Sequence, residues 1–291
     1  MARRWWCWNW WTGNSGEGSG TARDGVATSN YRAVIAYDGT EYSGFQVQAD
    51  QRTIQGELER ALQRLSQGFV RVHGAGRTDA GVHAQAQVIS FRADWAHGPE
   101  ALQRAMNAVL PQDIAVRELS GAEEGFHARY SASGRVYLYS IYHGQVRSPL
   151  WQRFAHHVAQ PLDLAAMNEA ARFLWGRQDF AAFGQPPCGE NTVRTMYRAG
   201  WQVSALGQGW STGSPPLWQF EIEADAFLRG MVRRIVGTLL AVGRGELTPP
   251  GLAEILASRD ISRARASVPA CGLCLWQVYY RREGVRSGGA W

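Results

Sequence analysis

The feature that most constrains the fold is an order of strand-like and helix-like segments that occurs twice along the chain. In the first half, runs with strand composition alternate with runs whose apolar residues recur at helical spacing. We expect these segments at 31–37, 53–66, 68–73, 85–92, 99–110 and 114–119. Their order is β-α-β-β-α-β, that of the split βαβ or ferredoxin-like arrangement.

The second half of the chain follows the same plan with little sequence similarity to the first. We expect its segments at 135–142, 162–175, 193–203, 217–224, 226–243, 251–258 and 272–280. The pattern therefore predicts an α+β protein of two ferredoxin-like (RRM-like) halves, with helices on one side of a mostly antiparallel sheet. We expect the exposed sheet faces to form a broad cleft, which would suit RNA.

The two ends of the chain differ in composition from the rest. Residues 1–29 combine Arg3-Arg4, a tryptophan cluster and a Gly/Ser/Thr-rich stretch. We interpret them as a disordered extension or an incorrectly chosen start codon, because the aliphatic core of a secretory signal is missing. We expect an N-terminal half at 30–132, a C-terminal half at 133–283 and a flexible tail at 284–291. No segment approaches the ~18 apolar residues of a membrane span, so no membrane association is expected.

The charge of the chain is mildly basic, and its basic residues are all arginine. Thirty Lys+Arg against 25 Asp+Glu leave a net charge of +5, which favours polyanionic partners. The absence of lysine fits selection for bidentate phosphate binding, but a GC-rich genome explains it better. It also excludes Schiff-base chemistry on a lysine side chain. Cys271 and Cys274 form a single CxxC at the start of a predicted strand, where a metal or redox pair is not expected.

Residues 71–84 form a glycine-rich loop between two predicted strands. Three glycines, Gly74, Gly76 and Gly81, allow backbone conformations that are closed to other residues. The pattern fails as a dinucleotide-binding loop, because Asp79 replaces its third glycine and a strand follows where a helix is required.

Three interpretations of the loop remain open on the residues alone. His73, Asp79 and His83 could ligate a metal, but no matching cluster occurs elsewhere at ligand spacing. A hairpin whose aspartate caps its own backbone is a purely structural alternative. The third is catalysis by an ionised Asp79 whose charge is held by arginines. A guanidinium at about 4 Å contributes ~4 kcal/mol at an intermediate dielectric, before desolvation is subtracted.

The loop resembles a known family motif. Residues 76–84 read GRTDAGVHA, which is similar to the signature of the TruA family of tRNA pseudouridine synthases. Further blocks that resemble this family follow in the expected order over residues 31–282. They are YDGT at 37–40, GFQ at 44–46, TIQGELE at 53–59, FHARYSA at 126–132, RVYLY at 135–139, DF at 179–180 and FLRGMVR at 227–233.

The resemblance implies the pseudouridine synthase fold of two ferredoxin-like halves. It implies isomerisation of uridine to pseudouridine at positions 38–40 in the anticodon stem-loop of tRNA, without a cofactor or a metal. A cytoplasmic homodimer is also implied, so that one tRNA can contact both subunits.

Residue roles follow from the resemblance, position by position. Asp79 matches the catalytic aspartate, Tyr137 the tyrosine that packs on the uracil, and Arg233 the arginine that pairs with the carboxylate. Arg77 is expected to contact the RNA backbone or to fill the space of the flipped base. Phosphate contacts are expected from three further arginines, Arg129, Arg135 and Arg234. Considered alone, Tyr137 would be a strand tyrosine of the core and Arg233 a charge on a helix surface.

An alternative of a different class is an RNA-binding protein that has kept the fold without the activity. Asp79, Arg77 and Tyr137 argue against it, because a protein that only binds RNA gains nothing from a buried carboxylate close to phosphate.

Overall fold

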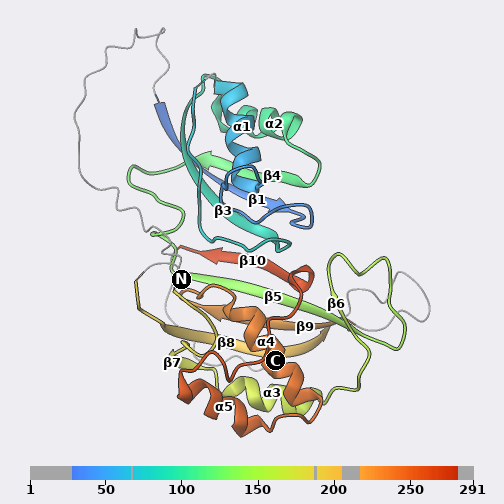
Figure 1. The fold of residues 1–291 in the computed structure, drawn as a ribbon. Coiled ribbons are helices and arrows are strands. Elements are labelled where there is room, and N and C mark those ends of the chain that lie inside the picture. Colours follow the sequence, from blue (N-terminus) through green and yellow to red (C-terminus); the bar gives the residue numbers. More distant parts are fainter. Residues whose placement is uncertain (1–27, 67, 187–188, 205–216, 281–291) are drawn as a thin grey trace.

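The computed structural model describes residues 28–66, 68–186, 189–204 and 217–280 (Figure 1). The expected extension therefore lies outside the described residues, apart from its last two positions, which begin strand β1 (Thr28–Tyr37). The expected tail at 284–291 also lies outside them. No helix in the described part of the chain is long and apolar enough to cross a membrane.

The N-terminal strands form an antiparallel sheet in the order β4-β1-β3, with β2 on the other edge of β3. The strands are β1, β2 (His73–Gly74), β3 (His83–Asp94) and β4 (Ile114–Gly121). Helix α1 (Ile54–Ser66) follows β1 in the chain, and helix α2 (Gly98–Val109) follows β3. Side chains at alternate positions of β1 are buried, which is the two-residue period of a strand with one face in the core.

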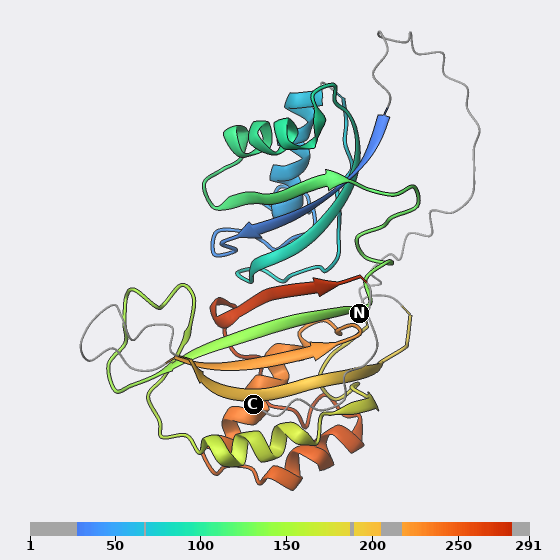
Figure 2. The same ribbon diagram turned by 180° about the vertical axis from the view of Figure 1, so that it is seen from behind.

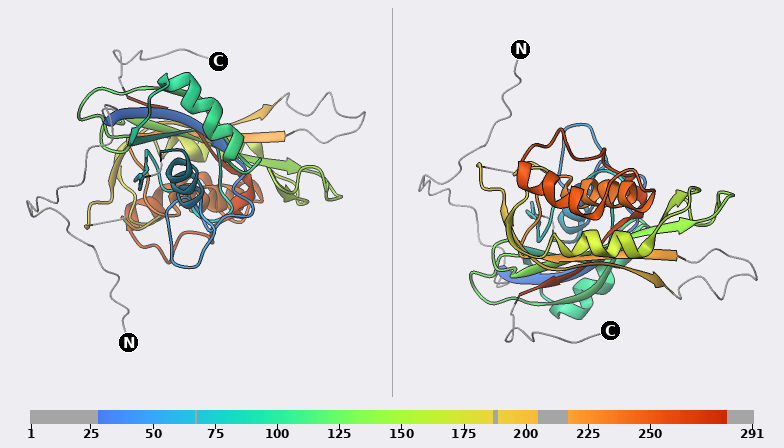
Figure 3. Two further views of the ribbon diagram at one scale, coloured as in Figure 1. Left: turned by 90° about the horizontal axis from the view of Figure 1, so that it is seen from above. Right: turned by 90° about the horizontal axis from the view of Figure 1, so that it is seen from below.

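The C-terminal strands follow the order β10-β5-β9-β8-β7, and β6 pairs with β5. These strands are β5 (Gly134–His143), β6 (His156–Val158), β7 (Gly176–Asp179), β8 (Val193–Ser204), β9 (Leu217–Ala224) and β10 (Leu273–Tyr279). The helices are α3 (Leu164–Arg172), α4 (Met231–Gly243), α5 (Pro249–Ser258) and a 3-10 turn, η1 (Ala270–Gly272). Seen from below, α3 and α5 lie together on one face of β8 and β9 (Figure 3).

A parallel pairing between β3 and β10 joins the two sets of strands into one ten-stranded sheet. Its register places Cys274 opposite His83 and Leu275 opposite Ala84, the last two residues of the glycine-rich loop. Figure 2 shows β10 between the N-terminal strands and β5. The expected α+β class with mostly antiparallel pairing is confirmed, and the last strand of the chain brings the two halves together.

Three expected elements were predicted clearly too long. The strand expected at 68–73 is reduced to His73–Gly74, because side chains of α1 bind the main chain before it. Glu59 accepts from the Val72 amide at 3.0 Å and Gln55 donates to the Val72 carbonyl at 3.1 Å.

The other two errors concern helices. The helix expected at 226–243 begins at Met231, because Gly230 has a φ of 71° and cannot continue a helix backward. The helix expected at 162–175 extends only over Leu164–Arg172, and Asp163 caps it by accepting from the Ala166 amide at 3.0 Å. The short strands β6 and β7 were not expected.

Candidate active site

Asp79 lies in the loop between β2 and β3, and the start of this loop is bound to β3. The Ala75 amide donates to the Val88 carbonyl at 2.8 Å. The buried Gln87 side chain binds both main-chain groups of Gly76, accepting at 3.1 Å and donating at 2.8 Å. These contacts fix the backbone three residues before the carboxylate.

A second segment, residues 42–45, fixes the residue directly before Asp79. The Phe45 amide donates to the Thr78 carbonyl at 3.0 Å. Gly44 has a φ of 96°, and a Cβ there would lie 2.8 Å from the same carbonyl oxygen. The Tyr37 hydroxyl lies 2.8 Å from Thr78 Oγ1 in a buried contact. The carbonyl and the side chain of Thr78 are therefore both held, which restricts the direction in which Asp79 projects.

Arg233 is the charged partner of Asp79. Its Nη1 lies 3.7 Å from Asp79 Oδ2, and the two side chains are 23% and 32% exposed. Arg233 Nε donates to the Val268 carbonyl at 2.7 Å, and the Val268 amide donates to the Arg233 carbonyl at 3.2 Å. The guanidinium is thus held on one side by main chain while the other side faces the carboxylate. Asp79 is partly buried, where the sequence suggested a buried carboxylate.

Tyr137 on β5 forms a buried wall beside the loop. Its ring meets Phe227 edge to face, with centroids 5.0 Å apart and an interplanar angle of 86°. A Cβ at Gly76 would lie 3.5 Å from its hydroxyl, an ordinary contact distance, so the tyrosine lies directly against this part of the loop. Burial raises the pKa of Tyr137 to about 12, against the positive charge of Arg135 and with a further contribution from the negative charge of Asp79. The hydroxyl is therefore neutral at physiological pH.

The other predicted arginines occupy different environments. Arg77 is exposed, two residues before Asp79. Arg129 and Arg234 are partly exposed. Arg135 is buried, and its guanidinium donates to the carbonyls of Ala75, Arg129 and Asp225 at 3.0, 2.9 and 2.7 Å. The expected phosphate contact by Arg135 is therefore wrong, because its donors are used inside the protein.

Comparison with known proteins shows the family of this chain. A family model described as tRNA pseudouridine synthase matches residues 33–131 and 170–281. The chain belongs to the tRNA pseudouridine synthase family. Asp79 and Arg233 lie within the matched ranges of this family, and Tyr137 lies between them.

Three similar proteins are each named tRNA pseudouridine synthase A. That of Geobacillus kaustophilus is 42% identical over 258 residues, which is 88% of this chain and 96% of the relative. That of Geobacter sulfurreducens is 41% identical over 249 residues, 86% of this chain and 98% of the relative. That of Chloroflexus aurantiacus is 44% identical over 248 residues, which is 85% of this chain and 87% of the relative.

His83, the histidine of the family-like motif, links the site to residues 145–155, and sequence reasoning missed this role. The Gly39 amide donates to His83 Nδ1 at 3.1 Å, so Nδ1 is unprotonated and Nε2 donates to the Arg153 carbonyl at 2.8 Å. Burial lowers the pKa of His83, although Asp38 Oδ1 lies 3.2 Å from Nδ1 and opposes this shift. The position of His83 in a motif was the available signal, but its partner Arg153 is distant in the sequence.

The interpretation of the loop as a metal site has no support in the structure. Among the residues that the model describes, no group of three or more His, Cys, Asp or Glu side chains could hold a metal ion.

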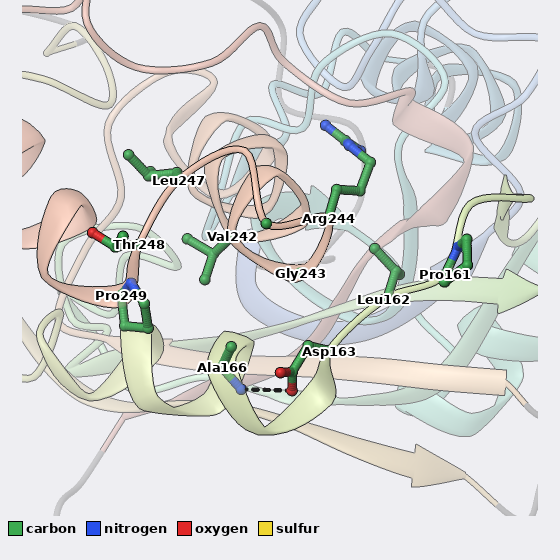
Figure 4. Close-up of a pocket in the computed structure, with 11 residues that line it drawn as sticks. Pro161, Leu162, Asp163, Ala166, Val242, Gly243, Arg244, Leu247, Thr248 and Pro249 are labelled. Atoms are coloured by element: carbon green, nitrogen blue, oxygen red, sulfur yellow. Dashed lines mark hydrogen bonds between the residues drawn. The ribbon is translucent and has the colours of Figure 1, made fainter.

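A surface hollow lies between α3 and the turn that follows α4 (Figure 4), and it contains none of the predicted site residues. Asp163 at its rim is already used as the cap of α3. The hollow is therefore not a candidate active site, and the loop that carries Asp79 is the candidate.

Proposed function

We propose that this chain isomerises uridine to pseudouridine in tRNA, at positions 38–40 of the anticodon stem-loop. The observation that carries the proposal is the meeting of Asp79, Arg233 and Tyr137, which come from three separate parts of the chain. Membership of the tRNA pseudouridine synthase family, with relatives at 41–44% identity over most of their length, supports the reaction.

The reaction breaks the bond between the ribose C1′ and the uracil N1. The uracil then turns, and its C5 forms a new bond to C1′. The hydrogen on C5 leaves as a proton, while N1 gains one, so no oxidant, reductant or metal is required. The target base must first leave its stack, which costs a few kcal/mol.

The proposed residue roles follow from the geometry and the motif. Asp79 acts as the catalytic carboxylate, and Arg233 orients it through a guanidinium fixed on Val268. Tyr137 packs against the uracil, and an aromatic stack of this kind contributes roughly 1–3 kcal/mol. Arg77 contacts the RNA backbone or takes the place of the flipped base, which its exposure permits.

The proposal extends to architecture and assembly. Two ferredoxin-like halves, at 30–132 and 133–283, are supported by the strand orders β4-β1-β3-β2 and β10-β5-β9-β8, which follow the same plan. We propose that two copies form a homodimer, so that one tRNA contacts both, and that the enzyme acts in the cytoplasm.

The competing proposal is an RNA-binding protein without activity. Such a protein would retain the basic charge and the sheet. The competing proposal, however, gives no reason for Arg233 to be held by Val268 while it faces Asp79. The Asp79–Arg233 contact therefore favours the enzyme.

Release of tritium from tRNA that carries [5-³H]uridine tests the activity, because the C5 hydrogen leaves only when the new carbon–carbon bond forms. We expect release by the wild type and none above background by Asp79→Asn, which preserves size and removes the charge. The matched control is Asp50→Asn, an exposed aspartate with a φ of 56° that asparagine tolerates. A wild-type protein that binds tRNA without releasing tritium would establish the competing proposal.

A further inference from the structure

A tight turn at residues 127–131, which we call the Tyr130 turn, lies between β4 and β5. The Tyr130 side chain is 78% exposed, the same fraction as the most exposed aliphatic residues of the described chain. The His127 ring lies against it with centroids 4.4 Å apart, and the Arg129 guanidinium carbon is 5.9 Å from its centroid. A single exposed tyrosine is common, so the argument depends on how this turn is held.

Hydrogen bonds within the turn leave its backbone little freedom. His127 Nδ1 accepts from the amides of Arg129 and Tyr130 at 3.1 and 3.4 Å. The Ser131 amide donates to the His127 carbonyl at 3.0 Å, and Ser131 Oγ accepts from the His127 amide at 3.2 Å. The exposed ring is therefore carried by a closed turn, which reduces the conformational entropy lost when a ligand binds.

The turn is also bound to the strands beneath it. The main chain of Ala128, which is fully buried, accepts from the Tyr280 hydroxyl at 2.8 Å and donates to Ser90 Oγ at 3.0 Å. These two contacts connect the turn to β3 and to the residue that follows β10. Tyr130 cannot withdraw into the core without breaking them.

Arg135 connects the Tyr130 turn to the loop that carries Asp79. A single nitrogen, Nη2, donates to the Arg129 carbonyl at 2.9 Å and to the Ala75 carbonyl at 3.0 Å. One buried guanidinium therefore bridges the main chain of the Tyr130 turn and that of the loop that carries Asp79.

A ring beside a guanidinium is suited to nucleic acid. Unpaired bases stack on aromatic side chains, and an adjacent arginine adds a cation for the phosphate or for the base itself. We propose that Tyr130 and Arg129 form a stacking platform for an unpaired nucleotide of the tRNA other than the one whose uracil reacts. This inference rests on the proposed function, because it takes tRNA as the substrate.

The experiment measures binding of transcribed full-length tRNA by fluorescence anisotropy, in an Asp79→Asn background so that binding is observed without turnover. Tyr130→Ser removes the ring and Tyr130→Phe retains it. Phe173→Ser is the matched control, because it removes an exposed ring at the end of α3. We expect Tyr130→Ser to raise Kd by about 5- to 150-fold, the ratio that corresponds to one base–aromatic stack. Tyr130→Phe and the control should remain within about twofold.

With Asp79 intact, Tyr130→Ser should raise KM while kcat changes little, because the platform positions RNA away from the reacting atoms. An unchanged Kd for Tyr130→Ser, or an equal loss for Tyr130→Phe, overturns the platform. So does a change in oligomer mass with unchanged tRNA affinity, which would place the ring in a protein interface. Failure of the proposed function is distinguishable, since wild-type protein would then bind tRNA through Tyr130 and release no tritium.

Discussion

Arg135 is the residue whose replacement we expect to affect both stability and activity most clearly. It is 9% exposed and donates three hydrogen bonds to main-chain carbonyls, those of Ala75, Arg129 and Asp225. These carbonyls belong to the loop that carries Asp79, to the Tyr130 turn and to the segment after β9. The perturbation is Arg135→Met, which retains most of the volume and removes every donor.

The magnitude follows from two opposing contributions. Hydrogen bonds that involve a charged group contribute about 1.5–3 kcal/mol each, so three would total roughly 5–9 kcal/mol. Removing a buried charge also removes its desolvation cost, which offsets several kcal/mol of that loss. Burial lowers the pKa of Arg135, which indicates that this cost is present. We expect a net loss of about 3 kcal/mol and a Tm lower by ~6–12 °C for a chain of this size.

Urea and thermal unfolding of wild type, Arg135→Met and Arg135→Lys measure this effect. Lysine has one nitrogen and cannot donate to all three carbonyls that the guanidinium binds. The stability of Arg135→Lys should therefore lie between those of the wild type and Arg135→Met. Arg71→Met is the control, because its ion pair with Glu59 at 3.5 Å involves a side chain that is 53% exposed, and such pairs contribute little. Turnover should fall with stability for Arg135→Met, since Ala75 lies close to Asp79 in the loop. A free energy of unfolding within about 0.5 kcal/mol of wild type would refute the reasoning.

Two further predictions concern Arg233 and His83. Arg233→Lys should lower turnover at least tenfold while Tm changes by only a few degrees, because one ammonium cannot both bind the Val268 carbonyl and face Asp79; wild-type turnover would contradict this. The pKa of His83 is lowered in the folded chain from its ordinary value of 6.5. As the pH falls through 6.5, the unfolded chain therefore binds a proton at this histidine before the folded chain does. The free energy of unfolding consequently decreases toward acid pH. The melting temperature of His83→Gln should therefore depend less on pH than that of the wild type between about pH 8 and 5. A residual dependence should remain from the other histidines of lowered pKa. The same dependence on pH in both proteins would exclude His83 as a cause. Those histidines are His73, His127 and His156.

Sequence reasoning was most accurate where a signal is local. The expected strand at 217–224 matches β9, and the expected helix at 53–66 differs from α1 by one residue. Both have strong periodicity and clear ends. It was least accurate where a distant side chain replaces a local pattern, as at Val72, whose main chain is bound by α1.

The same distinction applies to the candidate site. The motif at 76–84 made Asp79 the candidate catalytic residue, and that role stays a prediction. The apolar neighbours of Arg233 indicated that it is not fully exposed, which the structure confirms. Arg135 was misassigned, because an arginine on a strand looks the same in sequence whether it binds phosphate or main chain. Its acceptors lie on three separate segments, so their identity depends on how those segments pack.

The sequence by itself determined the order of the strands and helices other than β6 and β7, the glycine-rich loop and the carboxylate that the loop carries. These depend on the two-residue and 3.6-residue periods and on the conformational freedom of glycine, which act over a few neighbours. Tertiary structure decided that β10 pairs with β3. It also decided that Arg233 faces Asp79 and that Arg135 links the Asp79 loop to the Tyr130 turn. Contacts between distant segments form only where packing brings particular atoms within a few ångströms of each other. A local sequence pattern contains no information about those distances.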